Sequence, residues 1–454
     1  MTKTCLFLST LILLCNYSFA QKPLPSNMFL KVLPNGLTVL VVEDNTVPLA
    51  TIEIAVKNGA YTETPEFNGL SHLYEHMFFK ANADYQNQSE FLERSQELGI
   101  IFNGQTSNEK VNYYFTLPKY NLENGLQLMN SAIQFPAFDK NEMKKENTVV
   151  DAEFQRHESN PVFVLTDAMD HHLWGDLYSR KNPIGDHEII NSATPEKMRI
   201  IRNKYYWPNN SLLIVAGDVQ HEDAFERVGN IFSEWKPSPF DPFEKYPQPE
   251  MKPLEKNDYF IVESPNARVP VMLFEWQGPD TRHDVLNTYV ADIFSFILIQ
   301  NASRMHKALV ESGLALQLNV NYLTERYTGP ISFSVVPNPN KIKQCFEEFR
   351  KQLDLLDSDD YFTDEQLALS KRLYEIRKIR DEEETSEFTH TLSYWWCSAS
   401  IDYFNSYIDN LNKVTRDDIK NYVRKYIKNK PHCAGLLLNP KTKSALDAES
   451  FFKP

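Results

Sequence analysis

The chain has 454 residues, of which 42% are hydrophobic and 24% are charged. A chain of this length and composition folds into two or three globular domains, which excludes a disordered or fibrous protein. Lys and Arg number 47 against 61 Asp and Glu, so the net charge is −14. This balance argues against nucleic acid or an anionic membrane surface as the main partner, because both are negatively charged.

The first residues have the pattern of a signal peptide. Lys3 gives a positive start, an apolar run of about eleven residues extends from Cys5 to Cys15, and Ser18-Phe19-Ala20 offers small residues for cleavage. The run is too short to span a bilayer, and the best later candidate, Ile293–Gln300, is bracketed by polar residues. We therefore expect residues 1–20 to be removed, no transmembrane segment, and export to the periplasm or the medium. A buried N-terminal strand is the alternative.

A proline-rich stretch divides the chain into halves of similar size. Six prolines fall between Trp235 and Asp258, where apolar periodicity is weak, and proline pre-sets extended backbone. We predict an N-terminal domain over 23–236, a stiff linker over 237–256 and a C-terminal domain over 257–446. The three cysteines beyond the signal peptide are odd in number and widely spaced, so we expect buried thiols and no disulfide framework.

Each half shows strands first and helices after, which favours an α+β fold with two similar halves, each an antiparallel sheet covered by helices. The strands expected in the first half are Leu37–Val42, Ala50–Val56 and Val111–Leu117, with a helix from Gly69. In the second half the expected elements are strands at Tyr259–Val262, Val269–Phe274 and Ile331–Val336, a helix over Val285–Arg304 and further helices from Asn340.

The motif His72-Leu73-Tyr74-Glu75-His76 carries the chemistry. On a helix, residues four apart share a face, so both imidazoles can reach one metal ion, and Glu75 lies beside that face, free to handle a proton. Two histidines and a distant carboxylate are the ligands of catalytic zinc. Two core histidines with a surface glutamate are the alternative.

The sequence also offers carboxylates for a third ligand, and one of them, Glu153, follows His76 by 77 residues. Glu146 and Glu153 are seven residues apart, about two helical turns, and therefore share a face. His157 lies one turn further on, and the adjacent His171 and His172 would point about 100° apart on a helix, which suits one metal poorly. For these three histidines we expect packing or surface roles.

These residues resemble the insulinase/pitrilysin family of inverted-motif zinc peptidases. The resemblance implies that His72, His76 and Glu153 bind one zinc ion, that Glu75 is the general base and that Glu146 supports the site as a second catalytic carboxylate. The resemblance also rests on Tyr205–Gly217 and on Asn103-Gly104-Gln105-Thr106. It covers nearly the whole chain after the signal peptide. It implies a processing-peptidase-like fold whose halves close around a chamber.

The implied activity is zinc-dependent hydrolysis of peptides and short unfolded polypeptides. Substrate would lie as an added strand beside Asn103–Thr106. Alternatives are a non-catalytic assembly subunit, as in core-protein relatives, and a self-standing processing peptidase that trims precursors at basic sites. The motif residues are all present, which disfavours the former, and the exported N-terminus disfavours the latter.

One departure concerns the second half. Many members of the family have there an Arg and a Tyr, seven residues apart, that grip substrate. Here Val310 stands near the expected Arg, and Leu316 or Gln317 near the expected Tyr, while Arg326-Tyr327 has the wrong spacing. The resemblance therefore implies a heterodimer with a related subunit that bears the Arg/Tyr pair, with a homodimer as the alternative.

Overall fold

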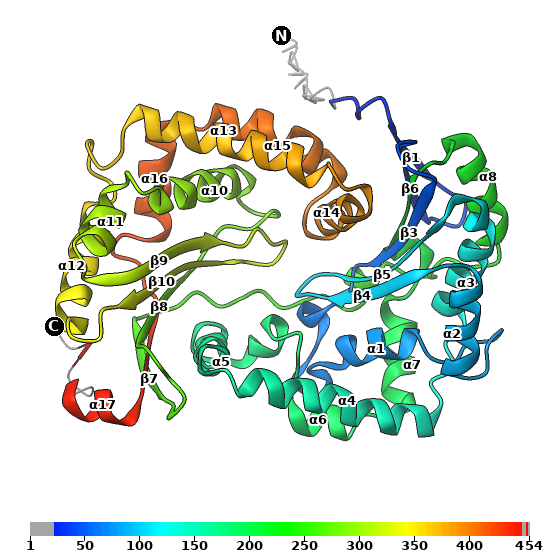
Figure 1. Ribbon diagram of the computed structural model, residues 1–454, viewed down its shortest axis with the longest axis horizontal. Coiled ribbons are helices and arrows are strands. Elements are labelled where there is room, and N and C mark those ends of the chain that lie inside the picture. The colour runs from blue at the N-terminus through cyan, green and yellow to red at the C-terminus, as the bar shows by residue number, and fades with distance from the viewer. Residues whose placement is uncertain (1–21, 447–450, 453–454) are drawn as a thin grey trace, which may run out of the picture.

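The computed structural model describes residues 22–446 and 451–452, and the expected signal peptide lies outside them. Two sheets, one in each half of the chain, stand side by side with helices around them (Figure 1). Each sheet has a hydrophobic core on its helix-covered face. The α+β architecture with two similar halves is as expected.

The first half contains a six-stranded sheet in the order β1-β2-β6-β3-β5-β4. Its strands are β1 (Met28–Val32), β2 (Thr38–Glu43), β3 (Leu49–Val56), β4 (Ile101–Thr106), β5 (Val111–Pro118) and β6 (Ser211–Gly217). Its helices are α1 (Leu70–Phe78), α2 (Gln88–Glu97), α3 (Leu122–Gln134), α4 (Lys140–Glu158), α5 (Pro161–Trp174), α6 (His187–Asn191), α7 (Pro195–Tyr205) and α8 (His221–Ile231). The short helix α9 (Pro242–Lys245) lies in the proline-rich connection.

The second half contains a five-stranded sheet in the order β7-β11-β8-β10-β9. Its strands are β7 (Asp258–Glu263), β8 (Val271–Gln277), β9 (Ala315–Tyr322), β10 (Pro330–Pro337) and β11 (Cys433–Leu438). Its helices are α10 (Val285–Ile299), α11 (Arg304–His306), α12 (Ile342–Leu355), α13 (Asp364–Asp381), α14 (Thr385–Ser398), α15 (Ile401–Lys413), α16 (Arg416–Tyr426) and α17 (Pro440–Leu446).

The two sheets have the same topology once β1 is set aside: the order β2-β6-β3-β5-β4 in the first sheet corresponds to β7-β11-β8-β10-β9 in the second. In each, the last strand returns after a series of helices and inserts between two earlier strands, parallel to one and antiparallel to the other. One pair of strands in each sheet is therefore parallel. A long crossover connection can join parallel strands, whereas a tight hairpin joins only antiparallel ones. The expectation of antiparallel sheets holds for the other pairs.

Each half supplies one helix to the other half's sheet. Helix α14 covers the outer face of the first sheet, where Phe388 and Leu392 pack on Leu212 and Ile214 of β6. Helix α5 covers the second sheet, where Leu165, Met169 and Leu173 pack on Val271, Leu273 and Leu437. Figure 1 shows α14 against the first half and α5 against the second. Because both faces of β6 are buried, its sequence is a continuous apolar run and not an alternating one.

Buried polar contacts reinforce this exchange. Glu109, in the turn between β4 and β5, accepts hydrogen bonds from the backbone N–H groups of Arg326 and Tyr327, both at 2.7 Å. Lys181 forms a fully buried ion pair with Glu325 and donates to the carbonyl of Tyr327. Burial and the charge of Glu325 raise the pKa of Glu109 to about 7. Buried charged side chains, paired with one another or hydrogen-bonded to backbone, thus join the two halves.

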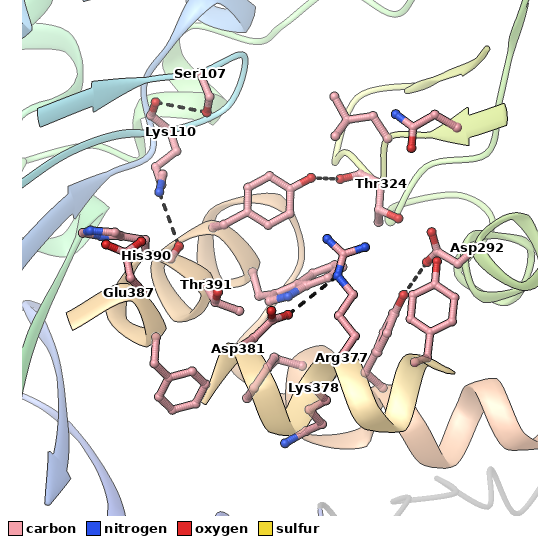
Figure 2. Close-up of a pocket in the computed structure, with 18 of the residues that line it drawn as sticks. Ser107, Lys110, Asp292, Thr324, Arg377, Lys378, Asp381, Glu387, His390 and Thr391 are labelled. Carbon is pink, nitrogen blue, oxygen red and sulfur yellow. Dashed lines mark hydrogen bonds and ion pairs between the residues drawn. The ribbon is translucent and has the colours of Figure 1, made fainter. Parts of the chain in front are cut away.

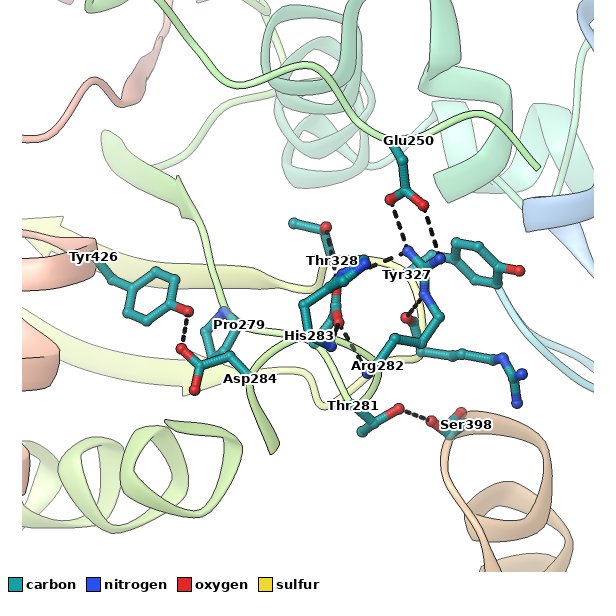
Figure 3. Close-up of polar contacts among 12 residues, drawn as sticks. Glu250, Pro279, Thr281, Arg282, His283, Asp284, Tyr327, Thr328, Ser398 and Tyr426 are labelled. Carbon is teal, nitrogen blue, oxygen red and sulfur yellow. Dashed lines mark hydrogen bonds and ion pairs between the residues drawn. The ribbon is translucent and has the colours of Figure 1, made fainter. Parts of the chain in front are cut away.

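The proline-rich connection contacts both halves. Gln248 accepts a hydrogen bond from Arg180 of the first half at 2.7 Å. Glu250 receives two hydrogen bonds at 2.8 Å from Arg282 of the second half, and the Arg282 guanidinium lies 3.9 Å from the ring centre of Tyr327 (Figure 3). Side-chain contacts therefore hold the connection to both halves at Gln248 and Glu250.

The apolar helix α10 ends at Ile299, before the expected Arg304. The helical stretch Val285–Glu311 has a length and mean hydropathy that also occur in membrane spans. Half of its most apolar part is buried inside the protein. Cys345, Cys397 and Cys433 are free and buried, as expected.

The buried ion pair between the halves predicts a stability effect. We expect Lys181→Met to lower the free energy of unfolding by about 3–5 kcal/mol, because it leaves buried carboxylates without a counter-charge. Glu109, with its raised pKa, binds a proton more tightly in the folded state, so the loss should be smaller at pH 6 than at pH 8. Denaturant unfolding at both pH values measures this. The matched variant Lys351→Met, at an exposed ion pair, should change stability by less than about 0.5 kcal/mol.

Candidate metal centre

Helix α1 positions the H-x-x-E-H residues. It begins after Gly69, whose φ of 85° lies in the left-handed region that favours glycine. The buried carboxylate of Glu63 accepts hydrogen bonds from the backbone N–H groups of Gly69 (2.7 Å) and Ser71 (2.6 Å). Glu63 thus satisfies donors at the helix N-terminus that have no partner inside the helix, and it fixes the start of α1. No motif in the sequence marks this residue.

Helix α4 brings the distant carboxylates to α1. The side chain of Asp139 caps its N-terminus, and the buried residues Met143 and Val150 pack it into the first core. Glu146 and Glu153 project from the same helix toward the two histidines, as their seven-residue spacing predicts.

Three donor atoms converge at the centre of the site. The Nε2 atoms of His72 and His76 are 3.2 Å apart, and the nearest carboxylate oxygen of Glu153 is 3.8 Å and 3.6 Å from them, respectively. Donors about 2.0–2.2 Å from one zinc ion have separations of this size. The residues therefore fit one zinc ion held by three protein ligands.

The contacts of His76 fix its orientation. Its Nδ1 donates to Glu146 at 2.8 Å, which leaves the Nε2 lone pair for a metal. The other oxygen of Glu146 is 2.6 Å from Nζ of Lys80, one turn after His76 on the chain. Burial alone would raise the pKa of Glu146, but the contacts with His76 and Lys80 lower it, so Glu146 stays ionised. Lys80 was not predicted, although its spacing of four residues from His76 was available in the sequence.

His72 has the properties of a ligand in the neutral form. Burial, with the nearby charges of His76 and His157, lowers its pKa to about 3. Its Nδ1 is buried and has no hydrogen-bond partner among the described residues. A neutral imidazole whose Nε2 faces a second imidazole nitrogen and a carboxylate is a donor set that a cation would stabilise.

Glu75 lies beside the donors, against the edge strand β4. Its carboxylate accepts a hydrogen bond from the hydroxyl of Thr106 at 2.7 Å. Burial raises the pKa of Glu75, which brings it toward the range of a general base. Gly104 touches the same side chain, because a Cβ at this position would lie 2.7 Å from Cγ of Glu75. Gly104 and Thr106 therefore position the expected general base.

Asn103 and Gln105 point to the opposite face of β4. They line a cavity of about 1030 Å³ between the halves, together with residues of β5, β9, α13 and α14. Figure 2 shows Arg377 and Asp381 from α13 and His390 and Thr391 from α14 in its wall. Strand β4 forms one edge of the first sheet, so its outer backbone groups are free to pair with an extended peptide.

The other histidines considered have different surroundings. His171 stacks on Tyr178, with ring centres 3.7 Å apart. Nδ1 of His172 donates to the Asp258 carboxylate at 2.7 Å, and the His172 ring stacks on a phenylalanine. His221, which the sequence motifs did not single out, contacts Glu43 through Nδ1 at 2.7 Å and Glu222 through Nε2 at 3.0 Å, and these three residues form a second group of possible metal donors. His157 is exposed and packs against Phe163, with ring centres 5.5 Å apart.

The second half has neither arginine nor tyrosine at the positions expected for the Arg/Tyr pair. Val310 packs against the second core, Leu316 is more than half exposed, and Gln317 is exposed on β9. The backbone of Arg326-Tyr327 instead bonds to Glu109 and so joins the halves.

Comparison with known sequences gives the class of protein that this fold and site define. The profile of insulinase (Peptidase family M16) matches residues 38–182, and the profile of the Peptidase M16 inactive domain matches residues 192–374. The chain therefore belongs to the insulinase family of peptidases, Peptidase M16. The region matched by the first profile includes His72, Glu75, His76 and Glu153.

Individual relatives agree with this class. An uncharacterized zinc protease of Rickettsia felis is 30% identical over 210 residues, which are 46% of this chain and 51% of the relative. The mitochondrial-processing peptidase subunit beta of Dictyostelium discoideum is 26% identical over 229 residues, 49% of this chain and 48% of the relative. The matches thus span about half the length of these curated relatives.

Solved structures have the same fold. A protease from Helicobacter pylori superposes with a TM-score of 0.80 at 21% identity, covering 90% of this chain and 99% of that structure. The first half of the periplasmic protease PqqL from Escherichia coli gives a TM-score of 0.76 at 17% identity, covering 96% of this chain and 98% of that structure.

The contact between β4 and Glu75 predicts the effect of a single methyl group. We expect Gly104→Ala to displace the Glu75 carboxylate with a stability loss of about 1–3 kcal/mol and, on the peptidase function proposed below, to lower kcat/KM for peptide cleavage by about 10²-fold. Gly229→Ala is the matched control, because a Cβ there meets open space on α8 and should stabilise the helix by about 0.5–1 kcal/mol. Wild-type activity in Gly104→Ala would contradict the close packing.

Proposed function

We propose that this chain is the metal-bearing part of an exported zinc endopeptidase that hydrolyses peptides and short unfolded polypeptides. The observation that carries the proposal is the convergence of the nitrogens of His72 and His76 with an oxygen of Glu153, beside the buried Glu75. The three donors would hold one zinc ion per chain. The relationship to proteins named zinc proteases supports the choice of zinc.

The site residues would act as follows. Zinc, when bound, supplies the positive charge that polarises the scissile carbonyl and makes water acidic near neutral pH. Glu75 takes a proton from the attacking water and returns it to the leaving amine nitrogen, so the carboxylate is regenerated in each cycle. Thr106 holds one oxygen of Glu75 by its hydrogen bond, and Glu146 keeps His76 oriented.

Substrate would bind as a strand added to the free edge of β4, along Asn103–Thr106. Backbone hydrogen bonds in such an arrangement hold an extended peptide with little regard to its sequence. Side chains of the added strand would alternate between the face of Glu75 and the cavity shown in Figure 2. A folded protein has few free extended segments, so this mode of binding selects peptides and unfolded chains.

We further propose a division of labour within and between chains. Residues 23–236 would form the catalytic domain and residues 257–446 the opposite wall of a chamber. A related chain that carries the Arg/Tyr pair would complete the site as a heterodimer, with a homodimer as the alternative. The subunit named in the Dictyostelium relative supports a two-chain enzyme, and the periplasmic protease among the similar structures supports export.

The general base provides the most direct test. We expect the wild-type protein to bind one zinc ion and to cleave a quenched fluorescent peptide, and Glu75→Gln to bind zinc equally well while its kcat falls by about 10²–10⁴-fold. Metal analysis and peptide kinetics measure this. Glu158→Gln, at an exposed position of α4, is the matched control and should cleave normally. Zinc binding without cleavage that depends on Glu75 would favour a non-catalytic assembly subunit.

The two-chain proposal predicts that the purified chain is only weakly active. Addition of a related subunit with the Arg/Tyr pair should raise kcat/KM by about 10²-fold or more, because donors to the developing oxyanion are worth about this factor. The comparison requires peptide kinetics with the chain alone and with the co-purified pair. Full activity of the chain alone, unchanged by the second chain, would refute the heterodimer.

A further inference from the structure

The two histidines of the candidate metal centre differ in what holds their rings. Nδ1 of His76 donates to Glu146 at 2.8 Å, so a side chain of α4 orients that ring. Nδ1 of His72 is buried and has no hydrogen-bond partner among the described residues. Its Nε2 faces the other metal donors, with Nε2 of His76 at 3.2 Å. The backbone of α1 therefore determines where the ring of His72 lies.

The carboxylate of Glu63 holds the first turn of α1, in which His72 is the third residue. One oxygen of Glu63 accepts from the N–H of Gly69 at 2.7 Å, and the other accepts from the N–H of Ser71 at 2.6 Å. These backbone groups have no acceptor inside the helix. Because each oxygen holds a different residue, the carboxylate fixes both the position and the direction of the turn that carries His72.

The contacts around this turn are rigid. Gly69 packs backbone to backbone on Gly185, since a Cβ at Gly69 would lie 2.5 Å from Cα of Gly185. Nδ2 of Asn58 donates to Oγ of Ser71 at 3.2 Å, and both residues are buried. Glu63 is only 3% exposed, and its hydrogen bonds to the start of α1 offset the cost of burying its carboxylate. The first turn thus has one well-defined position, which depends on Glu63.

We propose that Glu63 is a positioning residue of the metal centre, which places the nitrogen of His72 for zinc by holding the first turn of α1. The proposal rests on the zinc binding proposed above and not on peptide hydrolysis. Without an acceptor from Glu63, a buried N–H of the first turn has no partner, and the turn must move to regain one. Such a movement displaces His72, whereas His76 lies one turn further on and is held by Glu146.

Variants with fewer acceptors at position 63 test this role. Glu63→Gln keeps one acceptor and Glu63→Ala keeps none, so we expect zinc affinity to fall by about 10-fold in the first and about 100-fold in the second, the range for outer partners of metal ligands. Competition with a chromophoric chelator measures the affinity. Burial raises the pKa of Glu63 to about 8, so the measurement is made at about pH 9, where the wild-type side chain is a carboxylate.

A second capping carboxylate provides the matched control. Asp241 accepts two backbone N–H hydrogen bonds at the start of α9, at 2.7 Å and 3.0 Å, and this helix carries none of the three metal donors. Asp241→Ala should therefore keep zinc affinity within about twofold of the wild type, because it removes a cap without touching α1. Denaturant unfolding of the metal-free proteins shows which variants fold, and Glu63→Gln decides the test if Glu63→Ala does not fold.

A double-variant cycle separates the positioning of His72 from a general loss of structure. In the His72→Ala background, Glu63→Gln should change zinc affinity by less than about twofold, because the ligand that it positions is absent. In the same background Glu146→Gln should still lower zinc affinity, since Glu146 acts through His76.

The outcomes that overturn the proposal are distinct from those that refute the proposed function. An equal loss of zinc affinity from Glu63→Gln with and without His72 would overturn the role of Glu63, as would unchanged zinc affinity in Glu63→Gln. Absence of zinc binding by the wild-type protein would refute the zinc centre and the role of Glu63 together. Zinc binding without cleavage that depends on Glu75 would refute the peptidase function and leave the role of Glu63 intact.

Discussion

The hydrogen bond between His76 and Glu146 is the contact on which the candidate site depends. It joins α1 to α4, two helices separated by 61 residues along the chain. It fixes the tautomer of His76, and through the rigid helix α4 it determines where Glu153 meets the two histidines. Lys80, one turn after His76 on the chain, balances the charge of Glu146. The positions of the donor atoms thus follow from the packing of α1 against α4. The His76–Glu146 contact lies at the centre of this interface, and buried apolar residues of both helices surround it.

The edge strand β4 connects this centre to the rest of the molecule. Gly104 and Thr106 touch Glu75 on one face, and Asn103 and Gln105 reach the cavity between the halves on the other. A strand alternates its side chains, so one segment can position the proposed general base and line the proposed substrate site at the same time. The halves hold the cavity walls in place through the exchange of α5 and α14 and through buried ion pairs.

Electrostatics distinguish this centre from an ordinary cluster of surface charges. The pKa of His72 is lowered by burial, so its nitrogen is free to donate to a metal, whereas burial raises the pKa of Glu75 and makes it a better base. The carboxylate of Glu146 remains ionised because two cationic or donor groups face it. The pKa values of His72 and Glu75, on one helix, are thus shifted in opposite directions. Burial is the main cause of both shifts, because it favours the neutral form of each side chain.

The sequence by itself predicted which side chains meet at the candidate site, because helical spacing places His72 with His76 and Glu146 with Glu153 on common faces. It also indicated two similar α+β halves and the proline-rich connection. It could not give Glu63, Lys80 or the pairing of Glu109 with Arg326 and Tyr327, since these contacts depend on packing between distant segments. The tertiary structure alone decided that the halves exchange helices and that one strand in each sheet runs parallel to a neighbour. Local periodicity reports which face of an element is buried, and only the folded chain decides which partner buries it.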